Sequence, residues 1–190
     1  MRFFKIEEQE IGVVPGKDCV LWTEGLSTCI CILVRGTIDR KSYLAMFHWD
    51  GFPCHLDRCA PNLASQLEGI VLRIFDALKL EIKRKMSSLK KPVMTSCICI
   101  GGEKRSESLS GTELEVDALN TYGMTACKRY FKVKKGATFL SHNFLTTGSV
   151  SLRVVFSFER LYCCDDSVPF EESNDTEQLE CGVSSRIYHV

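Results

Sequence analysis

The sequence predicts one α/β domain of the α+β kind, in which a mixed, largely antiparallel β-sheet is packed with helices. Short apolar runs bounded by turn residues dominate residues 1–50, and such runs are typical of buried strands. A long segment with apolar residues every third or fourth position follows, as in an amphipathic helix. The chain has 190 residues, 45% of them hydrophobic, which is enough for one substantial core.

The first strands are expected at residues 11–14, 19–22, 29–34 and 43–49. Residues 35–41 between the last two runs are turn-like. Strands 29–34 and 43–49 are therefore expected to be antiparallel neighbours joined by a short connection.

The long amphipathic helix is expected at residues 63–86, after a proline-containing loop. Ser65 and Glu68 fit a capping box near its start, and Asn62 is a competing cap. Pro92 ends the helical region. The stripe consists of Leu63, Leu67, Ile70, Ile74, Leu78 and Ile82.

A strand at residues 93–100 is expected next, ended by Gly101-Gly102. Thr112 and Glu115 match a capping box, and the helix that they open is expected to end near Gly123. Further strands are expected at residues 125–133 and 150–158. Residues 1–162 then form the domain, and residues 163–190, with seven acids and one base, form an acidic tail.

Charge and cysteine usage limit the classes of function. Bases and acids balance at 24 each, and the basic run at residues 79–91 has no interleaved aromatics, so we expect a solvated helix face and no nucleic-acid partner. No apolar run approaches a membrane span, and no signal peptide is visible. The 11 cysteines are scattered, which favours free thiols in a reducing cytoplasm. An effector secreted into a host cytosol has the same composition.

Two residues suggest thiol chemistry. Cys29 follows the small-residue turn at 25–28 and enters a buried strand, a position that holds a nucleophile rigidly near backbone N–H groups. His48 ends the next expected strand, at the same edge of the sheet, where a general base is needed. Cys31 points the same way but deeper, and we expect it to be structural. The alternative is that these residues only pack in the core.

Other thiols give no comparable signal. Cys54, His55 and Cys59 lack a common zinc spacing, so no metal is expected. Cys97, Cys99 and the pair Cys163-Cys164 are expected to be core or surface thiols. No phosphate loop or dinucleotide fingerprint is present, and no cofactor is expected.

The segment TEGLSTC, residues 23–29, resembles the T-x-G-L-x-S-C motif of CheD-type chemoreceptor glutamine deamidases, and the L-S-G-C motif of the cytotoxic-necrotizing-factor deamidase toxins. The resemblance implies Cys29 as nucleophile, His48 as general base and Thr23 as the residue that orients the imidazole. Backbone N–H groups around Ser27 and Thr28 would hold the oxyanion. It also implies a cysteine pKa lowered by an adjacent imidazolium.

The function expected is deamidation of a glutamine in a partner protein by a monomeric enzyme. The chain lacks the I-G-x-R-N motif that follows Gly101-Gly102 in the chemotaxis enzymes, and it carries an acidic tail, so we expect an effector or toxin. The alternatives are a chemoreceptor-type deamidase, a transglutaminase or thiol hydrolase with the same thioester, and an inactive binding module.

Overall fold

The computed structural model describes residues 1–54, 56–102, 112–142, 151–166 and 186–189. Its elements, in chain order, are β1 (Arg2–Lys5), β2 (Ile11–Pro15), β3 (Cys19–Leu26), β4 (Ile30–Ile38), β5 (Lys41–Trp49), α1 (Leu63–Lys85), β6 (Val93–Gly101), α2 (Glu113–Tyr130), β7 (Lys132–His142), β8 (Leu152–Phe156), β9 (Arg160–Asp165) and β10 (Arg186–His189).

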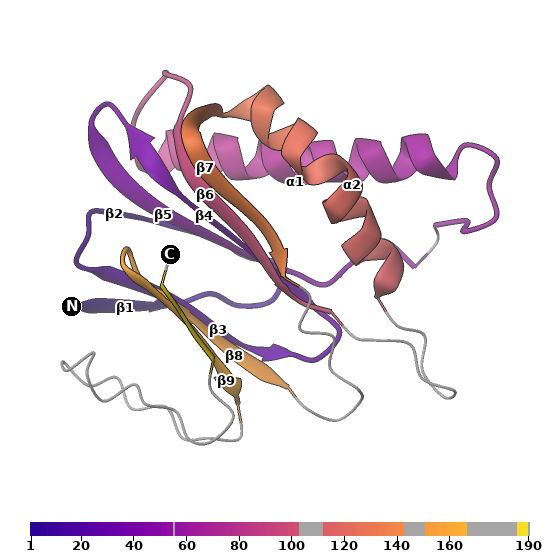
Figure 1. The fold of residues 1–190 in the computed structure, drawn as a ribbon, viewed down its shortest axis with the longest axis horizontal. Coiled ribbons are helices and arrows are strands. Elements are labelled where there is room, and N and C mark those ends of the chain that lie inside the picture. Colours follow the sequence, from indigo (N-terminus) through magenta and orange to yellow (C-terminus); the bar gives the residue numbers. More distant parts are fainter. Residues whose placement is uncertain (55, 103–111, 143–150, 167–185, 190) are drawn as a thin grey trace.

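The described elements form three layers (Figure 1). Helices α1 and α2 cover one face of a five-stranded sheet in the order β2-β5-β4-β6-β7, here called the helix-covered sheet. A second five-stranded sheet, in the order β1-β3-β8-β9-β10 and here called the outer sheet, packs on its other face. The pairs β1–β3 and β6–β7 are parallel and the rest antiparallel, which confirms the mixed α+β class.

The strands divide between two sheets, where the sequence pattern predicts one. The chain changes sheet three times near its start, in the connections at residues 6–10, 16–18 and 27–29. These connections are as short as hairpin turns, so a sequence cannot distinguish a crossing between packed sheets from a turn within one sheet.

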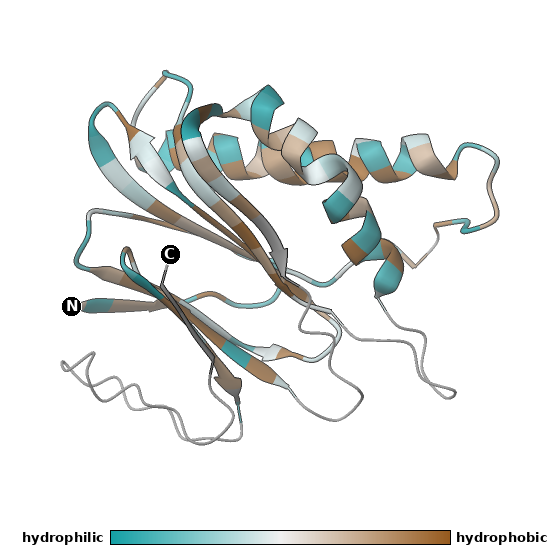
Figure 2. Cartoon of the chain, viewed as in Figure 1, coloured by the Kyte–Doolittle hydropathy of each residue, from teal (hydrophilic) through white to brown (hydrophobic). Residues whose placement is uncertain are grey.

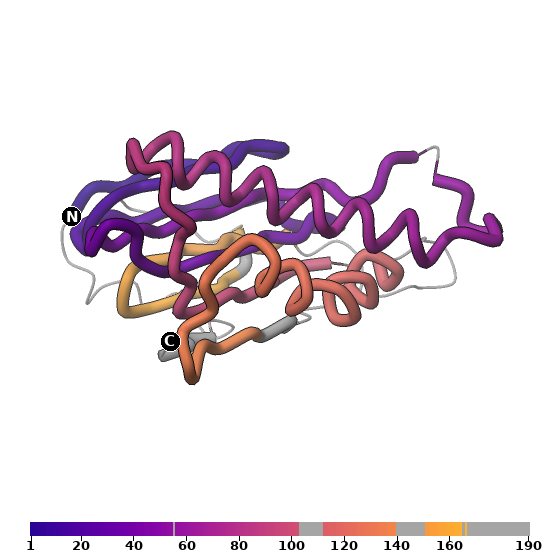
Figure 3. The backbone as a smooth tube through the Cα atoms, turned by 90° about the horizontal axis from the view of Figure 1, so that it is seen from above, coloured from indigo at the N-terminus to yellow at the C-terminus, as the bar shows by residue number. Residues whose placement is uncertain are grey.

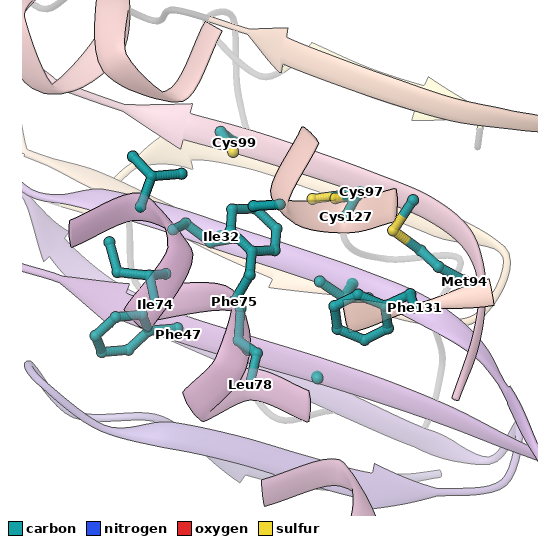
Figure 4. Close-up of a cluster of buried hydrophobic side chains, with 14 of the residues drawn as sticks. Ile32, Phe47, Ile74, Phe75, Leu78, Met94, Cys97, Cys99, Cys127 and Phe131 are labelled. Atoms are coloured by element: carbon teal, nitrogen blue, oxygen red, sulfur yellow. The ribbon is translucent and has the colours of Figure 1, made fainter. Parts of the chain in front are cut away.

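The helix-covered sheet is buried on both faces. Ile30, Ile32 and Val34 of β4 face the helices, whereas Cys31 and Leu33 face the outer sheet. This is why β4 reads as a continuous apolar run. Figure 2 shows hydrophobic residues along these strands, and Figure 4 shows Phe75 and Leu78 of α1 gathered over them.

Helix α1 confirms the expected long amphipathic helix, with Leu67, Ile74 and Leu78 among its buried residues. It lies beside α2 on the same side of the sheet (Figures 1 and 3). The capping box expected from Ser65 does not mark the helix start, because α1 begins at Leu63 with the competing residue Asn62 at the cap position, where no side-chain cap hydrogen bond forms.

Helix α2 extends to Tyr130, so the predictions of a helix end near Gly123 and a strand at 125–133 are wrong for residues 124–130. A Cβ at Gly123 would lie 2.5 Å from the Phe139 ring of β7, so this glycine permits close packing and does not end the helix. Thr112 makes no capping hydrogen bond to the helix. Instead of completing a capping box, Glu115 accepts a hydrogen bond from the Phe52 N–H at 3.4 Å.

The later strands β8, β9 and β10 complete the outer sheet. Strand β8 lies within the expected 150–158. The proposed domain boundary at residue 163 falls inside β9, and β10 pairs with β9 at the far end of the expected tail. In the described part of the chain, no helix has the length and apolar character needed to cross a membrane.

Candidate active site

Cys29 lies where the chain passes from the outer sheet to the helix-covered sheet. Strand β3 ends at Leu26 and β4 begins at Ile30, so Cys29 directly precedes the buried strand. Gly25, with a φ of +77°, turns the chain, and the Ser27 N–H donates to the Gly25 carbonyl at 3.0 Å. The Cys29 residue is 8% exposed. This is the strand-mouth position that the sequence predicts.

A set of ion pairs holds the chain immediately before this turn. The pairing of β3 with β8 shifts register between Thr23 and Leu26, as at a β-bulge. Within the bulge, the Glu24 carboxylate accepts from Arg153 of β8 at 3.0 Å and pairs with Lys5 of β1 at 3.0 Å. The Lys5 ammonium is the main reason that the pKa of Glu24 is lowered. Glu24 thus ties β3 to both its neighbours beside the mouth.

His48 lies near the end of β5, on the face that packs against the outer sheet. Its Cα partner on β4 is Cys31. Cys29 is two residues earlier and clusters with Cys31 between the two sheets, so it lies diagonally across from His48. Diagonal partners have Cα atoms about 7–8 Å apart, which the imidazole side chain can span. The two candidate residues therefore share one face at one edge.

Thr23 and His48 meet across the two sheets. Thr23 belongs to β3 of the outer sheet and is fully buried, and its Oγ1 lies 2.7 Å from His48 Nδ1. The same Oγ1 lies 2.7 Å from the Ile6 carbonyl oxygen. A carbonyl can only accept, so the single hydroxyl proton of Thr23 is donated to Ile6. The Nδ1 atom must then carry a proton and donate it to Thr23.

This assignment leaves Nε2 of the neutral imidazole as a lone-pair acceptor. His48 is 3% exposed, and burial lowers its pKa against the raising influence of Glu8, Asp50 and Glu7. Its Nε2 atom is buried and has no hydrogen-bond partner among the described residues, so no hydrogen bond joins it to Cys29. His48 has the tautomer and the free nitrogen that a general base requires.

Burial disfavours the thiolate forms of Cys29 and Cys31. Burial, together with the negative charges of Glu8 and Asp50, raises the pKa of Cys29, while a hydrogen bond with the Thr28 side chain lowers it. These directions run against the lowered cysteine pKa and the adjacent imidazolium that the resemblance implies, because burial disfavours the charged form of both residues. Cys31 is fully buried, and burial raises its pKa well above the usual value, as suits a structural thiol.

The backbone at the mouth offers donors for an oxyanion. The Ser27 N–H is already used by Gly25. Thr28 is exposed and lies outside the strands, and within the described residues the backbone N–H groups of Thr28 and Cys29 form no backbone hydrogen bond. These two N–H groups, in place of the expected Ser27 group, are the candidates.

The sequence analysis missed the main-chain support of His48. The Gln9 N–H donates to the His48 carbonyl at 2.8 Å, and the His48 N–H donates to the Glu10 carbonyl at 3.2 Å. With the Ile6 carbonyl on Thr23, residues 6–10 hold both members of the pair. These contacts use backbone atoms, which leave no side-chain pattern in a sequence.

Gly101 fits tightly against the backbone of Cys29. A Cβ there would lie 2.4 Å from the Cys29 carbonyl oxygen, and its φ is +109°. We expect Gly101→Ala to lower the free energy of unfolding by about 1–3 kcal/mol, measured by urea denaturation. Gly16→Ala is the matched control, because φ is +87° there and nothing lies within 4 Å. Equal losses in the two variants would show that the contact with Cys29 does not matter.

Of the remaining thiols, Cys163 lies in the same buried cluster as Cys29 and Cys31. Cys54 and Cys59 are exposed, and His55 lies outside the described residues. In the described ranges, no group of three or more His, Cys, Asp or Glu side chains could hold a metal ion. A cavity of about 270 Å³ lies on the outer sheet between Lys17 and Arg160, and none of the predicted site residues lines it.

Neither the protein-family models nor the curated proteins include a match to this chain.

Proposed function

We propose that the protein is a cysteine-dependent glutamine deamidase that converts a glutamine of a partner protein to glutamate. The observation that carries the proposal is the state of His48. Its Nδ1 is fixed by Thr23, and its Nε2 is buried, basic and unpartnered among the described residues. Cys29 lies on the same face at the mouth of the strand. The motif at residues 23–29 adds the reaction class by resemblance.

The chemistry follows from a neutral thiol and a neutral base. As Cys29 Sγ attacks the carboxamide carbon, the thiol proton moves to His48 Nε2 and the carbonyl electrons form an oxyanion. The N–H groups of Thr28 and Cys29 stabilise that charge. His48 then protonates the amide nitrogen, the C–N bond breaks, and ammonia leaves a thioester. Water, deprotonated by His48, attacks the thioester and releases glutamate and the thiol.

The orienting role of Thr23 can be separated from its packing. Thr23→Val keeps the shape of the side chain but removes the acceptor for His48 Nδ1 and the donor to Ile6. We expect kcat to fall about tenfold, because the imidazole loses the hydrogen bond that fixes its tautomer. Thr23→Ser retains the hydroxyl and is the matched control, with kcat close to wild type. Equal loss in both variants would assign Thr23 to packing alone.

The proposed reaction is tested directly on protein substrates. Intact-protein mass spectrometry of a reduced cytosolic protein pool, with and without the enzyme, should show the mass change from amide to acid in a substrate, together with ammonia release. If ammonia is released but the substrate gains a primary amine in place of the amide-to-acid mass change, the enzyme is a transglutaminase, because the same thioester is resolved by an amine. If neither occurs, the protein is a binding module. The acidic tail and the absent chemotaxis motif favour an effector that acts in a host cytosol.

A further inference from the structure

Two exposed carboxylates, Glu8 and Asp50, lie near the candidate active site. Residues 6–10 run beside His48 through two backbone hydrogen bonds, which brings the exposed side chain of Glu8 to this edge. Asp50, also exposed, follows His48 by two residues at the end of β5. Both carboxylates act electrostatically on Cys29 and on His48. The surroundings of Cys29 and His48 therefore carry negative charge from two segments, residues 6–10 and the end of β5.

The nearby bases neutralise other acids and not these two. Lys5 pairs with Glu7 at 3.3 Å and with Glu24 at 3.0 Å, and Arg153 also pairs with Glu24. Within the described part of the chain, neither Glu8 nor Asp50 forms an ion pair. Their charge is unfavourable to a thiolate, so it opposes the chemistry unless a cation arrives with the substrate.

A second feature of this entrance points to a bound group. The Nε2 atom of His48 is buried, basic and without a partner among the described residues. An unsatisfied polar atom in a buried position is costly, and a ligand or reacting group that supplies the missing partner is one reason that such an atom is retained. Glu8 and Asp50 both act electrostatically on this imidazole.

We propose that Glu8 and Asp50 select a basic segment of the partner protein, with Lys or Arg next to the target glutamine. This proposal rests on the proposed function and adds the substrate class. The cation of the substrate would neutralise the two carboxylates as it binds, and the attacking sulfur would then develop negative charge in a less repulsive field. Binding of a basic substrate segment is in this way coupled to activation of Cys29.

The first test uses glutamine peptides that differ only in the flanking residues, either lysine, serine or glutamate. We expect kcat/KM to be about tenfold higher with lysine than with serine, to be lowest with glutamate, and to fall as salt screens the charges. The double variant Glu8→Gln with Asp50→Asn should remove the lysine preference. Glu159→Gln is the control, because Glu159 is exposed and lies at the opposite end of the outer sheet.

The second test does not require deamidation. Wild type is labelled with neutral iodoacetamide or with anionic iodoacetate. At Cys29 the rate with iodoacetamide is divided by the rate with iodoacetate, and this ratio is then divided by the same ratio at exposed Cys54. We expect a value of about three to ten at low salt, because the entrance repels the anion. The double variant should bring it close to one. A change in thiolate fraction affects both reagents equally, so it cancels in the ratio.

The outcomes separate the two proposals. An elevated ratio without any peptide deamidation overturns the proposed function but retains a cation-selective entrance. Deamidation without a lysine preference overturns the substrate class alone. A ratio near one in wild type, or no labelling of Cys29 by either reagent, overturns the inference that this entrance receives a basic ligand.

Discussion

Cys29→Ala is expected to abolish deamidation, with kcat/KM lowered by at least about 10³-fold, because the variant lacks the thiol proposed to form the thioester. Cys29→Ser tests the thiol itself, since the hydroxyl has similar size but a much higher pKa. The measurement is ammonia release together with trapping of an acyl-enzyme at Cys29 by rapid acid quench and mass spectrometry.

Cys31→Ala is the matched control for this experiment. Cys31 lies on the same face and directly opposite His48, but it is fully buried. We expect Cys31→Ala to lower stability by about 1–2 kcal/mol through the cavity it leaves, while activity in the folded protein is retained. If Cys31→Ala were inactive and Cys29→Ala active, the nucleophile would be the inner thiol and the mouth would be only structural.

His48→Ala is expected to lower kcat by about 10³-fold and to alter the pH profile. Burial lowers the pKa of His48, so in the wild type the base stays neutral at neutral pH, and activity should be lost only as the pH falls through a value below 6.5. Burial raises the pKa of Cys29, so the activity is not expected to reach a plateau near neutral pH through formation of a free thiolate. The acid limb should disappear in His48→Ala.

The pH profile also distinguishes two mechanisms. A preformed thiolate-imidazolium pair would give an alkylation rate at Cys29 that is high and flat through neutral pH. With a neutral pair, the alkylation rate should continue to rise towards alkaline pH. A flat profile in wild type that becomes steep in His48→Ala would contradict the assignment of neutral resting groups.

The parts of the fold that could be predicted are those with local patterns. The stripe of α1 and the apolar run of β4 are each encoded within a short window, and both are in the structure. The end of α2 could not be predicted, because Gly123 resembles a helix stop but serves to admit Phe139 of β7, which is distant in the sequence. Likewise, Cys163 and Cys164 in an acidic context read as a tail, although both are buried in β9.

The candidate site divides in the same way. The sequence analysis predicted an orienting role for Thr23, and the contact with His48 exists, but the proton assignment depends on the Ile6 carbonyl, which no motif records. The pKa of Cys29 is raised, whereas the resemblance implies a lowered one, because burial raises it most and the charges of Glu8 and Asp50 raise it further, and the sequence reveals neither. Motif spacing indicates which side chains meet, whereas the electrostatic field around them depends on burial and on charged residues that only the folded structure brings close.

The placement of Thr23 and His48 on different sheets also bears on when the chain acquires activity. The residues proposed for chemistry all lie before residue 50, so they leave the ribosome early. However, β3, which carries Thr23, has β8 as one of its two neighbours, and β8 begins at residue 152. A contact between segments so far apart in sequence forms late in folding. A nascent chain would thus carry all the residues proposed for chemistry. It would remain inactive until its last strands joined the outer sheet.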